Sequence, residues 1–192
     1  MGSAERDRCV LLSGLMGSGK SRVGRALALE LGWDFVDTDV EIERVAGLSV
    51  AEIFAREGEP AFRARERDAL RALPTQRCVV ALGGGAVVSA ENRAILAAKG
   101  RLLWLDAEPE TLVERMGEAR DRPLLAGLDR AGRVAKLTAL RAERGAAYAE
   151  AELRVATDGC TIAQAVSRVR EALHGAQGCA NAVDKKRVGG AK

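Results

Sequence analysis

The sequence predicts an α/β fold of three layers, α/β/α, in which a five-stranded parallel sheet lies between helices. Short apolar runs bounded by turn residues alternate along the chain with segments of helical apolar periodicity. This alternation is typical of a parallel sheet that is covered on both faces. The chain has 192 residues, 47% of them hydrophobic, so it can bury one full core.

The apolar runs and the helical patterns define the predicted elements in chain order. Two helix starts are well marked, because Ser49 to Glu52 fits a capping box and Pro109 suits a first turn. The predicted strands are Cys9–Ser13, Asp34–Val36, Cys78–Leu82, Leu102–Leu105 and Leu153–Val155. The predicted helices are Lys20–Leu31, Ala51–Glu57, Pro60–Leu73, Glu91–Lys99, Pro109–Met116, Val134–Tyr148 and Ile162–Leu173.

The segment between the first predicted strand and the first predicted helix reads G-L-M-G-S-G-K-S, from Gly14 to Ser21. This is the spacing of a phosphate-binding loop, in which glycines let backbone N–H groups point at a polyphosphate and the following helix adds its positive end. Lys20 would then reach the β- and γ-phosphates, and the Ser21 hydroxyl would ligate Mg²⁺. A glycine-rich turn that binds nothing is the alternative, and the strand before and helix after the motif argue against it.

The second predicted strand ends in Asp37-Thr38-Asp39. In an open parallel sheet the carboxyl end of a strand beside the first lies at the ligand crevice. If the triplet is extended, its two carboxylates point the same way, and one can face a metal while the other faces an acceptor hydroxyl. The alternative is a helix N-cap followed by an acidic first turn.

Three further features are candidates for an acceptor site. The third predicted strand runs into Gly83-Gly84-Gly85, which exposes backbone N–H groups and permits a close approach by a ligand. Arg63 and Arg144 lie in helical patterns and are candidates for bidentate recognition of a carboxylate, although isolated arginines on helices are usually solvated. Arg122 lies between Gly117 and Gly132, a stretch that suits a mobile lid over the transferring phosphate; a plain surface loop is the alternative.

Composition and charge exclude other classes of function. The net charge is +3 and the arginines form no long basic block, so nucleic acid is not an expected partner, and 3% aromatics leave few stacking platforms. Cys9, Cys78, Cys160 and Cys179 form no C-x-x-C pair, which predicts reduced thiols rather than disulfides or a zinc site. No apolar run could cross a bilayer and no signal peptide is visible, so we expect a cytoplasmic protein without a membrane partner.

Taken in this order, these segments resemble shikimate kinase, a family of P-loop enzymes with a fold like that of nucleoside monophosphate kinases. The resemblance covers about Val10 to Leu173, and the combination of motifs is far more specific than any single one. It rests on Gly14 to Ser21, Asp37-Thr38-Asp39, Phe62-Arg63 with Glu66, Gly83-Gly84-Gly85, Arg122-Pro123-Leu124, and Leu140 with Arg144, Tyr148 and Glu150.

The resemblance implies transfer of the γ-phosphate of ATP to the 3-hydroxyl of shikimate, with Mg²⁺, in the chorismate route to aromatic amino acids. It implies catalytic roles for Lys20, Asp39 and Arg122, and a metal site formed by Ser21 and, through water, Asp37. Shikimate would be bound by Asp39, Arg63, Gly83, Gly84, Gly85 and Arg144. ATP would be bound by Gly14, Gly17, Ser18, Gly19, Lys20, Ser21, Arg22, Arg115 and Arg122, with Arg115 stacking on the base.

The chemistry of phosphoryl transfer agrees with these roles, because it depends mostly on positioning and on neutralising charge. His174, the only histidine, lies at the start of the predicted tail, so the best placed proton acceptor is the carboxylate of Asp39. Asp39 could also serve only to orient the acceptor, because a loose transition state releases the hydroxyl proton late. The loop Asp158-Gly159-Cys160-Thr161 lacks a basic residue that some relatives have near the base.

Residues 1–175 are expected to form a single kinase domain, with substrate-binding helices at about 40–73 and a lid at about 117–132. Residues 176–192 show almost no apolar periodicity and are predicted to be a disordered tail. We expect a monomer. Two alternative functions stay open: a related P-loop kinase for gluconate or a nucleotide, and an inactive regulatory module, whose mark would be loss of Lys20 or of an aspartate in the triplet.

Overall fold

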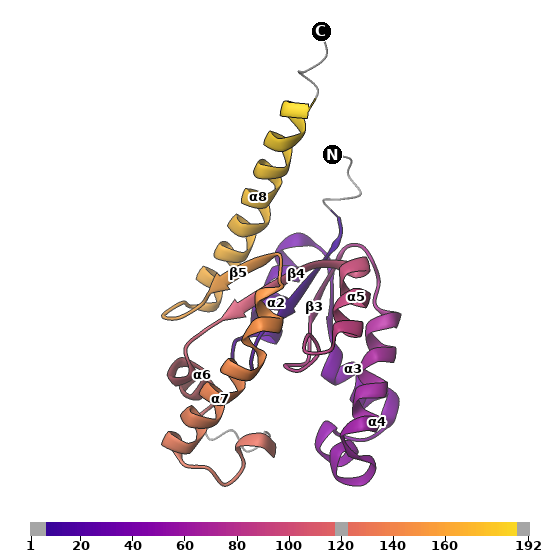
Figure 1. Cartoon of the computed structure of the whole chain (residues 1–192), viewed down its shortest axis with the longest axis vertical. Helices are drawn as coiled ribbons and strands as arrows, with labels where there is room; N and C mark the ends of the chain where they lie inside the picture. The colour runs from indigo at the N-terminus through magenta and orange to yellow at the C-terminus, as the bar shows by residue number, and fades with distance from the viewer. Residues whose placement is uncertain (1–6, 118–122, 188–192) are drawn as a thin grey trace.

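The structure is a computed structural model that describes residues 7–117 and 123–187. Its centre is a five-stranded sheet, parallel throughout, in the order β2-β3-β1-β4-β5 (Figure 1). The strands are β1 (Cys9–Ser13), β2 (Asp34–Asp37), β3 (Cys78–Ala81), β4 (Gly100–Asp106) and β5 (Leu153–Ala156). The helices are α2 (Lys20–Leu31), α3 (Thr38–Ala46), α4 (Val50–Ala72), α5 (Ala90–Lys99), α6 (Pro109–Met116), α7 (Arg130–Ala149) and α8 (Ile162–Arg187), with a 3₁₀ turn at Pro123–Leu125.

Apolar side chains fill both faces of the sheet, which confirms the three layers that the sequence predicts. On one face α2 and α8 pack against alternate residues of the strands, and on the other α4, α5, α6 and α7 do so. The alternation of side chains along each strand sends neighbours to opposite faces, so Leu11 and Leu12 are both fully buried in different clusters. Continuous apolar runs therefore form strands here because both faces are covered.

The sheet order brings three loops to one edge. β1 is central and pairs with β3 through Leu12 and Ala81, while β2 pairs with β3 through Asp37 and Ala81. Because the strands are parallel, the residues that follow β1, β2 and β3 all leave the sheet at its carboxyl edge. These residues are the phosphate-loop motif, the aspartate triplet and the glycine run.

At the aspartate triplet the structure decides between the two interpretations that the sequence left open. The triplet is not extended throughout, because β2 ends at Asp37 and α3 begins at Thr38. The Asp37 side chain accepts a 3.2 Å hydrogen bond from the Asp39 amide as the N-cap, and Asp39 and Glu41 lie in the first turn. A capping aspartate and acidic residues near the positive helix end favour a helix over a longer strand, as the alternative interpretation had it.

The long helix α4 joins the two helices predicted on either side of Gly58. Gly58 has φ 82° and ψ 171°, which interrupts the helical backbone, and Pro60 follows in the first turn of the second segment. The N-terminal segment begins with the predicted capping box, in which Ser49 and Glu52 bond each other's backbone amides. Ile42 of α3 packs with Ile53 of α4 in a small separate core.

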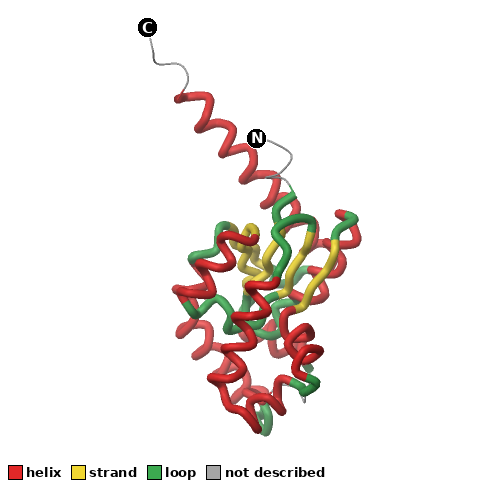
Figure 2. The backbone as a smooth tube through the Cα atoms, turned by 90° about the vertical axis from the view of Figure 1, so that its right-hand side faces the viewer, coloured by secondary structure: helices red, strands yellow, loops and turns green. Residues whose placement is uncertain are grey.

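Two helices are longer than predicted. α7 begins at Arg130, capped by the side chain of Asp129, and not at Val134. α8 continues to Arg187, so the chain is helical over 176–187, where the sequence predicted a disordered tail. Alanine, lysine and arginine are strong helix formers and no proline intervenes, which favours continuation of a helix that has already started. Figure 2 shows α8 extending beyond the rest of the domain; residues 188–192 lie outside the described residues.

Over the described ranges, no helix is both long and apolar enough to span a bilayer. Cys9, Cys78 and Cys160 are free thiols. The register between β1 and β3 places Cys9 beside Cys78, a proximity that their wide spacing in the sequence did not reveal.

Candidate active site

The loop from Gly14 to Ser21 has the backbone that its sequence predicts. Gly14, Gly17 and Gly19 all have positive φ angles, of 139°, 82° and 93°. A Cβ on Gly14 would lie 2.4 Å from the Leu105 carbonyl oxygen, so the loop can pass this strand only without a side chain there. α2 starts directly after Gly19, which as N-cap has no side chain to bond the first amides of the helix. This arrangement leaves a helix N-terminus and a ring of backbone amides suited to an anion.

Two side chains of this loop are held close to its backbone. Lys20 donates from Nζ to the carbonyl oxygens of Gly14 at 2.9 Å and Leu15 at 3.0 Å. Ser18 is buried, and its Oγ has no hydrogen-bond partner among the described atoms. Arg22, in the first turn of α2, is exposed. The ammonium group of Lys20 therefore lies folded over the loop, where it would meet a bound polyphosphate.

Ser21 and Asp37 form the contact that fits a metal ion. Ser21 donates from Oγ to Oδ2 of Asp37 at 2.6 Å, which joins the start of α2 to the end of β2. Mg²⁺ prefers hard oxygen ligands and is usually held by one or two protein groups together with waters and substrate phosphates. A hydroxyl and a carboxylate beside a phosphate loop have that chemistry, so these residues fit the ion.

The three glycines after β3 each make room for a different group. A Cβ on Gly83 would lie 2.7 Å from Oδ1 of Asp39, and one on Gly85 would lie 2.8 Å from Nη1 of Arg63. Gly84 faces the phosphate loop, because its Cβ position is 3.6 Å from the Gly14 carbonyl oxygen. The three glycines therefore allow the Asp39 carboxylate, the Arg63 guanidinium and the phosphate loop to approach one short backbone segment.

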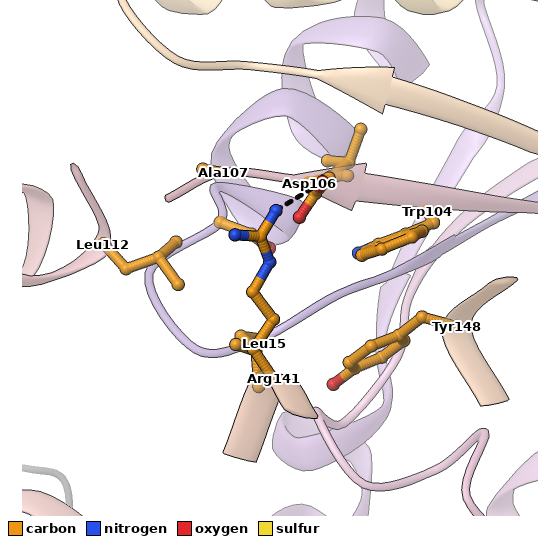
Figure 3. A pocket seen from close by; sticks show the side chains of 9 residues that line it. Leu15, Trp104, Asp106, Ala107, Leu112, Arg141 and Tyr148 are labelled. Atoms are coloured by element: carbon orange, nitrogen blue, oxygen red, sulfur yellow. Dashed lines mark hydrogen bonds and ion pairs between the residues drawn. The ribbon is translucent and has the colours of Figure 1, made fainter. Parts of the chain in front are cut away.

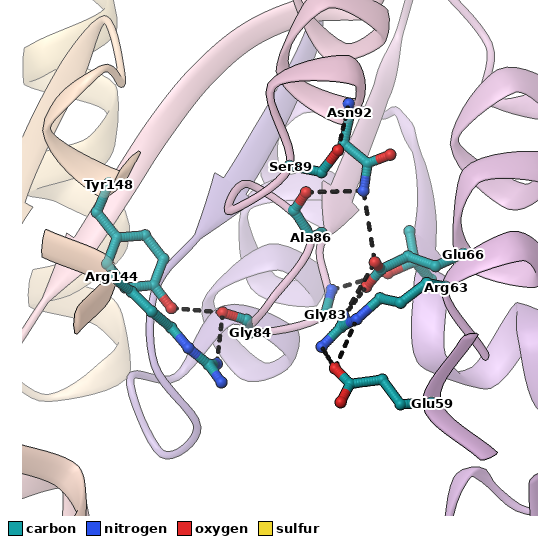
Figure 4. Close-up of polar contacts among 11 residues, drawn as sticks. Glu59, Arg63, Glu66, Gly83, Gly84, Ala86, Ser89, Asn92, Arg144 and Tyr148 are labelled. Carbon is teal, nitrogen blue, oxygen red and sulfur yellow. Dashed lines mark hydrogen bonds and ion pairs between the residues drawn. The ribbon is translucent and has the colours of Figure 1, made fainter. Parts of the chain in front are cut away.

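Arg63 lies between two carboxylates of its own helix. Its Nη1 donates to Glu66 at 3.0 and 3.2 Å, and its Nε and Nη2 donate to Oε1 of Glu59 at 3.2 and 3.0 Å (Figure 4). Glu59 is largely exposed whereas Glu66 is buried. The ring of Phe62 packs against that of Phe54, with centroids 4.7 Å apart and planes tilted by 34°. The sequence places Arg63 correctly on a helix but does not reveal how its fork is held.

Glu66 is a buried acid whose charge is balanced by named groups. Burial raises the pKa of Glu66 and the charge of Asp39 raises it further, whereas Arg63 and the amide of Asn92 lower it; the net shift is upward. Asn92 donates from Nδ2 to Glu66 at 3.4 Å and to the Ala86 carbonyl at 2.9 Å. Asn92 was missed by the sequence reasoning, because an isolated asparagine near a helix start signals only a cap.

Arg144 and Tyr148 of α7 reach the glycine run from the other side. Arg144 donates from Nη1 to the Gly84 carbonyl at 3.2 Å, and the Tyr148 hydroxyl donates to the same oxygen at 2.5 Å. Figure 4 shows Arg144 and Arg63 on opposite sides of this run. The two arginines predicted to share a carboxylate are therefore brought to the same backbone segment from helices that are distant in sequence.

Arg115, a predicted ATP residue, lies apart from this group. Arg115 of α6 donates to the side chain and carbonyl of Thr157, in the loop after β5, and so lies beside the segment Asp158–Thr161. The side chain of Asp158 accepts from the Glu108 amide at 2.9 Å. Arg122, the predicted lid arginine, lies outside the described residues. The start of α7 at Arg130 shortens the predicted loop at its C-terminal end.

Thr38, the middle residue of the triplet, is buried and links two strands' ends. Its Oγ1 accepts from the Gly83 amide at 2.9 Å and donates to the Ala81 carbonyl at 3.3 Å. It thereby ties the start of α3 to the glycine run. The sequence reasoning gave Thr38 no role of its own, since a threonine between two acids carries no distinct pattern.

A phosphate loop follows the central strand of this parallel sheet, with a hydroxyl and a carboxylate beside it and cationic groups across from it. These features are typical of a P-loop phosphotransferase. The family model described as shikimate kinase matches residues 16–174. The chain belongs to the shikimate kinase family.

Individual relatives agree with this membership over nearly their whole length. The shikimate kinase of Geobacter metallireducens is 46% identical over 169 residues, which are 88% of this chain and 93% of that protein. The shikimate kinase of Symbiobacterium thermophilum is 49% identical over 168 residues, covering 85% and 95%. A solved structure of shikimate kinase from Acinetobacter baumannii in complex with shikimate is 34% identical, with a TM-score of 0.79 over 88% of this chain and 94% of that one.

Proposed function

We propose that this chain transfers the γ-phosphate of ATP to the 3-hydroxyl of shikimate, giving shikimate 3-phosphate and ADP in the chorismate route. One observation carries the choice of acceptor. Arg63 and Arg144 flank a glycine run whose middle residue abuts the phosphate loop. A small alcohol that bears a carboxylate could be held by both arginines while its hydroxyl lies near the loop.

On the nucleotide side, the chain's groups neutralise and orient the polyphosphate. The amides of the loop and the first turn of α2 would bind phosphate oxygens, and Lys20 would exchange its contacts with the Gly14 and Leu15 carbonyls for the β- and γ-phosphates. Ser21 and, through water, Asp37 would hold Mg²⁺, which when bound supplies positive charge between the phosphates. Gly14, Gly17, Ser18, Gly19 and Arg22 complete the proposed phosphate contacts, Arg115 faces the base, and Arg122 acts from the lid.

On the acceptor side, Arg63 and Arg144 would bind the carboxylate, and Asp39 would contact the ring hydroxyls. Asp39 lies against Gly83, whereas Gly84 and Gly85 lie closer to the two arginines. The glycine run therefore separates the acidic end of the site from its basic end. Asp39 would orient the attacking hydroxyl and accept its proton as the bond to phosphorus forms. The amides of Gly83, Gly84 and Gly85 border the same space.

The test is a coupled ADP-release assay with shikimate, gluconate and nucleoside monophosphates as acceptors. We expect ATP turnover to depend on shikimate, with phosphate on its 3-hydroxyl by NMR. Equal or greater stimulation by gluconate or a nucleotide would support the alternative of a related small-molecule kinase. Absence of turnover with every acceptor, from a protein that binds ATP, would support an inactive regulatory module.

The organisation of the protein is part of the same proposal. We infer one kinase domain over residues 1–175, with acceptor-binding helices at about 40–73 and a lid at about 117–132, acting as a monomer in the cytoplasm. The free thiols of Cys9, Cys78 and Cys160 support a reducing compartment. Sedimentation of the purified chain at micromolar concentration tests the monomer, since a dimer would double the measured mass.

A further inference from the structure

Helix α7 contacts the rest of the site through three side chains on one face. Arg141 donates to the carboxylate of Asp106 at 3.0 Å, at the end of β4 (Figure 3). One turn further along, Arg144 donates to the Gly84 carbonyl, and after another turn Tyr148 donates to that same oxygen. Residues three and four apart share a helix face, so these contacts act together on the position of α7.

The Tyr148 ring is fixed in place before any ligand binds. It is 1% exposed and stacks on Trp104 of β4, with centroids 5.6 Å apart and an interplanar angle of 18°. Burial raises the pKa of Tyr148 to about 12, so its hydroxyl stays protonated at neutral pH and remains a donor. Leu15 and Ser18 of the phosphate loop line the same small depression as both rings.

Gly84 is the point at which the two substrate regions meet. Its Cβ position lies 3.6 Å from the Gly14 carbonyl oxygen and 3.8 Å from the Met16 amide nitrogen of the phosphate loop. The same position lies 4.0 Å from Nη1 of Arg144. A shift of the Gly84 peptide would therefore change the distance between the phosphate loop and an arginine proposed to bind the acceptor.

The Gly84 carbonyl has two donors of different geometry. The hydroxyl of Tyr148 approaches to 2.5 Å, whereas Nη1 of Arg144 lies at 3.2 Å. Because the Tyr148 hydroxyl already donates to this oxygen, the carbonyl attracts the Arg144 guanidinium less strongly. The other N–H groups of Arg144 can then bind a ligand. Without the hydroxyl, the partly buried carbonyl would depend on Arg144 alone.

We infer that Tyr148 is a positioning residue for the carboxylate-bearing acceptor. Its hydroxyl holds the Gly84 carbonyl so that the Arg144 fork is presented to the acceptor and not drawn onto the backbone. The inference rests on the proposed function, because it takes Arg144 as a ligand of the shikimate carboxylate. Tyr148 would then contact neither substrate, but it would set the orientation of Arg144, which contacts the acceptor.

Tyr148→Phe is the direct test, since it keeps the stacked ring and removes only the hydroxyl. Loss of one hydrogen bond of this kind is expected to raise KM and the calorimetric Kd for shikimate about threefold to tenfold. The KM for ATP should stay within about twofold, and kcat should fall by less than KM rises. An unchanged affinity for shikimate, with or without a lower Tm, would overturn the inference.

Ser13→Ala is the matched control. It removes another buried hydroxyl that donates to a backbone carbonyl, that of Leu103 at 2.9 Å. A similar loss of Tm without a change in shikimate affinity is expected for this variant. If Ser13→Ala weakens shikimate binding as much as Tyr148→Phe does, the effect is one of general stability and the inference fails.

The route through Arg144 is tested by combining the variants. In an Arg144→Lys background the guanidinium fork is already lost, so Tyr148→Phe should change shikimate affinity by less than it does in the wild type. An equal fold-change in both backgrounds would overturn the assigned route. If the wild type itself neither binds nor turns over shikimate, the proposed function fails instead, and that result is distinct from each of these.

Discussion

Ser21 and Asp37 are joined by a 2.6 Å hydrogen bond that links the phosphate loop to the end of β2, two strands away from β1. Asp39, only two residues later, lies instead over Gly83 and raises the pKa of Glu66 by its charge. The helix start at Thr38 turns the chain between them, so the two acids of one triplet face different regions. This separation predicts different consequences for their loss.

Asp37→Asn is expected to raise the Mg²⁺ concentration needed for half-maximal activity, because the carboxylate proposed to hold the ion through water loses its charge. Asp39→Asn is expected to lower kcat by about 10²–10⁴-fold even at saturating shikimate, because the proton acceptor and orienting anion is lost. Both are measured by titrating Mg²⁺ and shikimate in the steady state. Rescue of Asp39→Asn, but not of Asp37→Asn, by added Mg²⁺ would reverse the two assignments.

Lys20→Ala removes the cationic group nearest the developing charge on the γ-phosphate. We expect kcat to fall on the order of a thousandfold or more, because electrostatic stabilisation of that charge is lost, while the fold is retained. Single-turnover kinetics measure the rate of phosphoryl transfer, and circular dichroism shows whether the fold is retained. Near-normal activity would contradict the assignment of the phosphate loop.

Arg63→Lys keeps the charge but loses the planar fork. Loss of a bidentate, charge-assisted contact is expected to raise KM for shikimate roughly tenfold to a hundredfold while leaving KM for ATP within about twofold. Arg56→Lys is the control, since Arg56 lies on the same helix and pairs with Glu52 on an exposed surface. Equal effects of the two changes would show that Arg63 has no special role.

Glu66→Gln tests the buried acid through the pH dependence of stability. The pKa of Glu66 is raised on folding, so its contribution to stability is fully present below its unfolded pKa, near 4.5, and is lost as the pH rises through the folded value. The Tm of Glu66→Gln minus that of the wild type should therefore increase as the pH rises through this window. A difference that stays constant or decreases with pH would contradict the raised pKa.

The last part of α8 is expected to contribute little. Among the α8 side chains that the structure describes, those that pack in the core are Ala165, Val166, Val169, Ala172 and Leu173. Truncation after Gly175 should change Tm by less than about 2 °C and leave kcat and both KM values nearly unchanged. Thermal unfolding and steady-state assays of the truncated chain test this, and a large loss would show that the removed segment docks.

Local patterns predicted much of the fold because each rests on interactions between neighbouring residues. β1, α2 and α6 have the predicted bounds, and the capping box of Ser49 and Glu52 is formed as expected. The structure departs from the prediction, or decides between alternatives, where local signals are ambiguous. At Asp37 the sequence left the cap and the extended strand both open, and α8 has no proline to mark its end.

The sequence by itself determined the phosphate loop, since that motif is contiguous and its glycines, lysine and serine act within eight residues. It also determined the parallel α/β class and, by resemblance, the shikimate kinase family that the family model confirms. Only the tertiary structure decided what surrounds Gly84: the convergence of Arg144 and Tyr148 on its carbonyl, with Arg63, Glu66 and Asn92 beside the same run. These residues come from helices far apart in the chain, and their contacts depend on the sheet order β2-β3-β1-β4-β5, which long-range packing sets and no local pattern encodes.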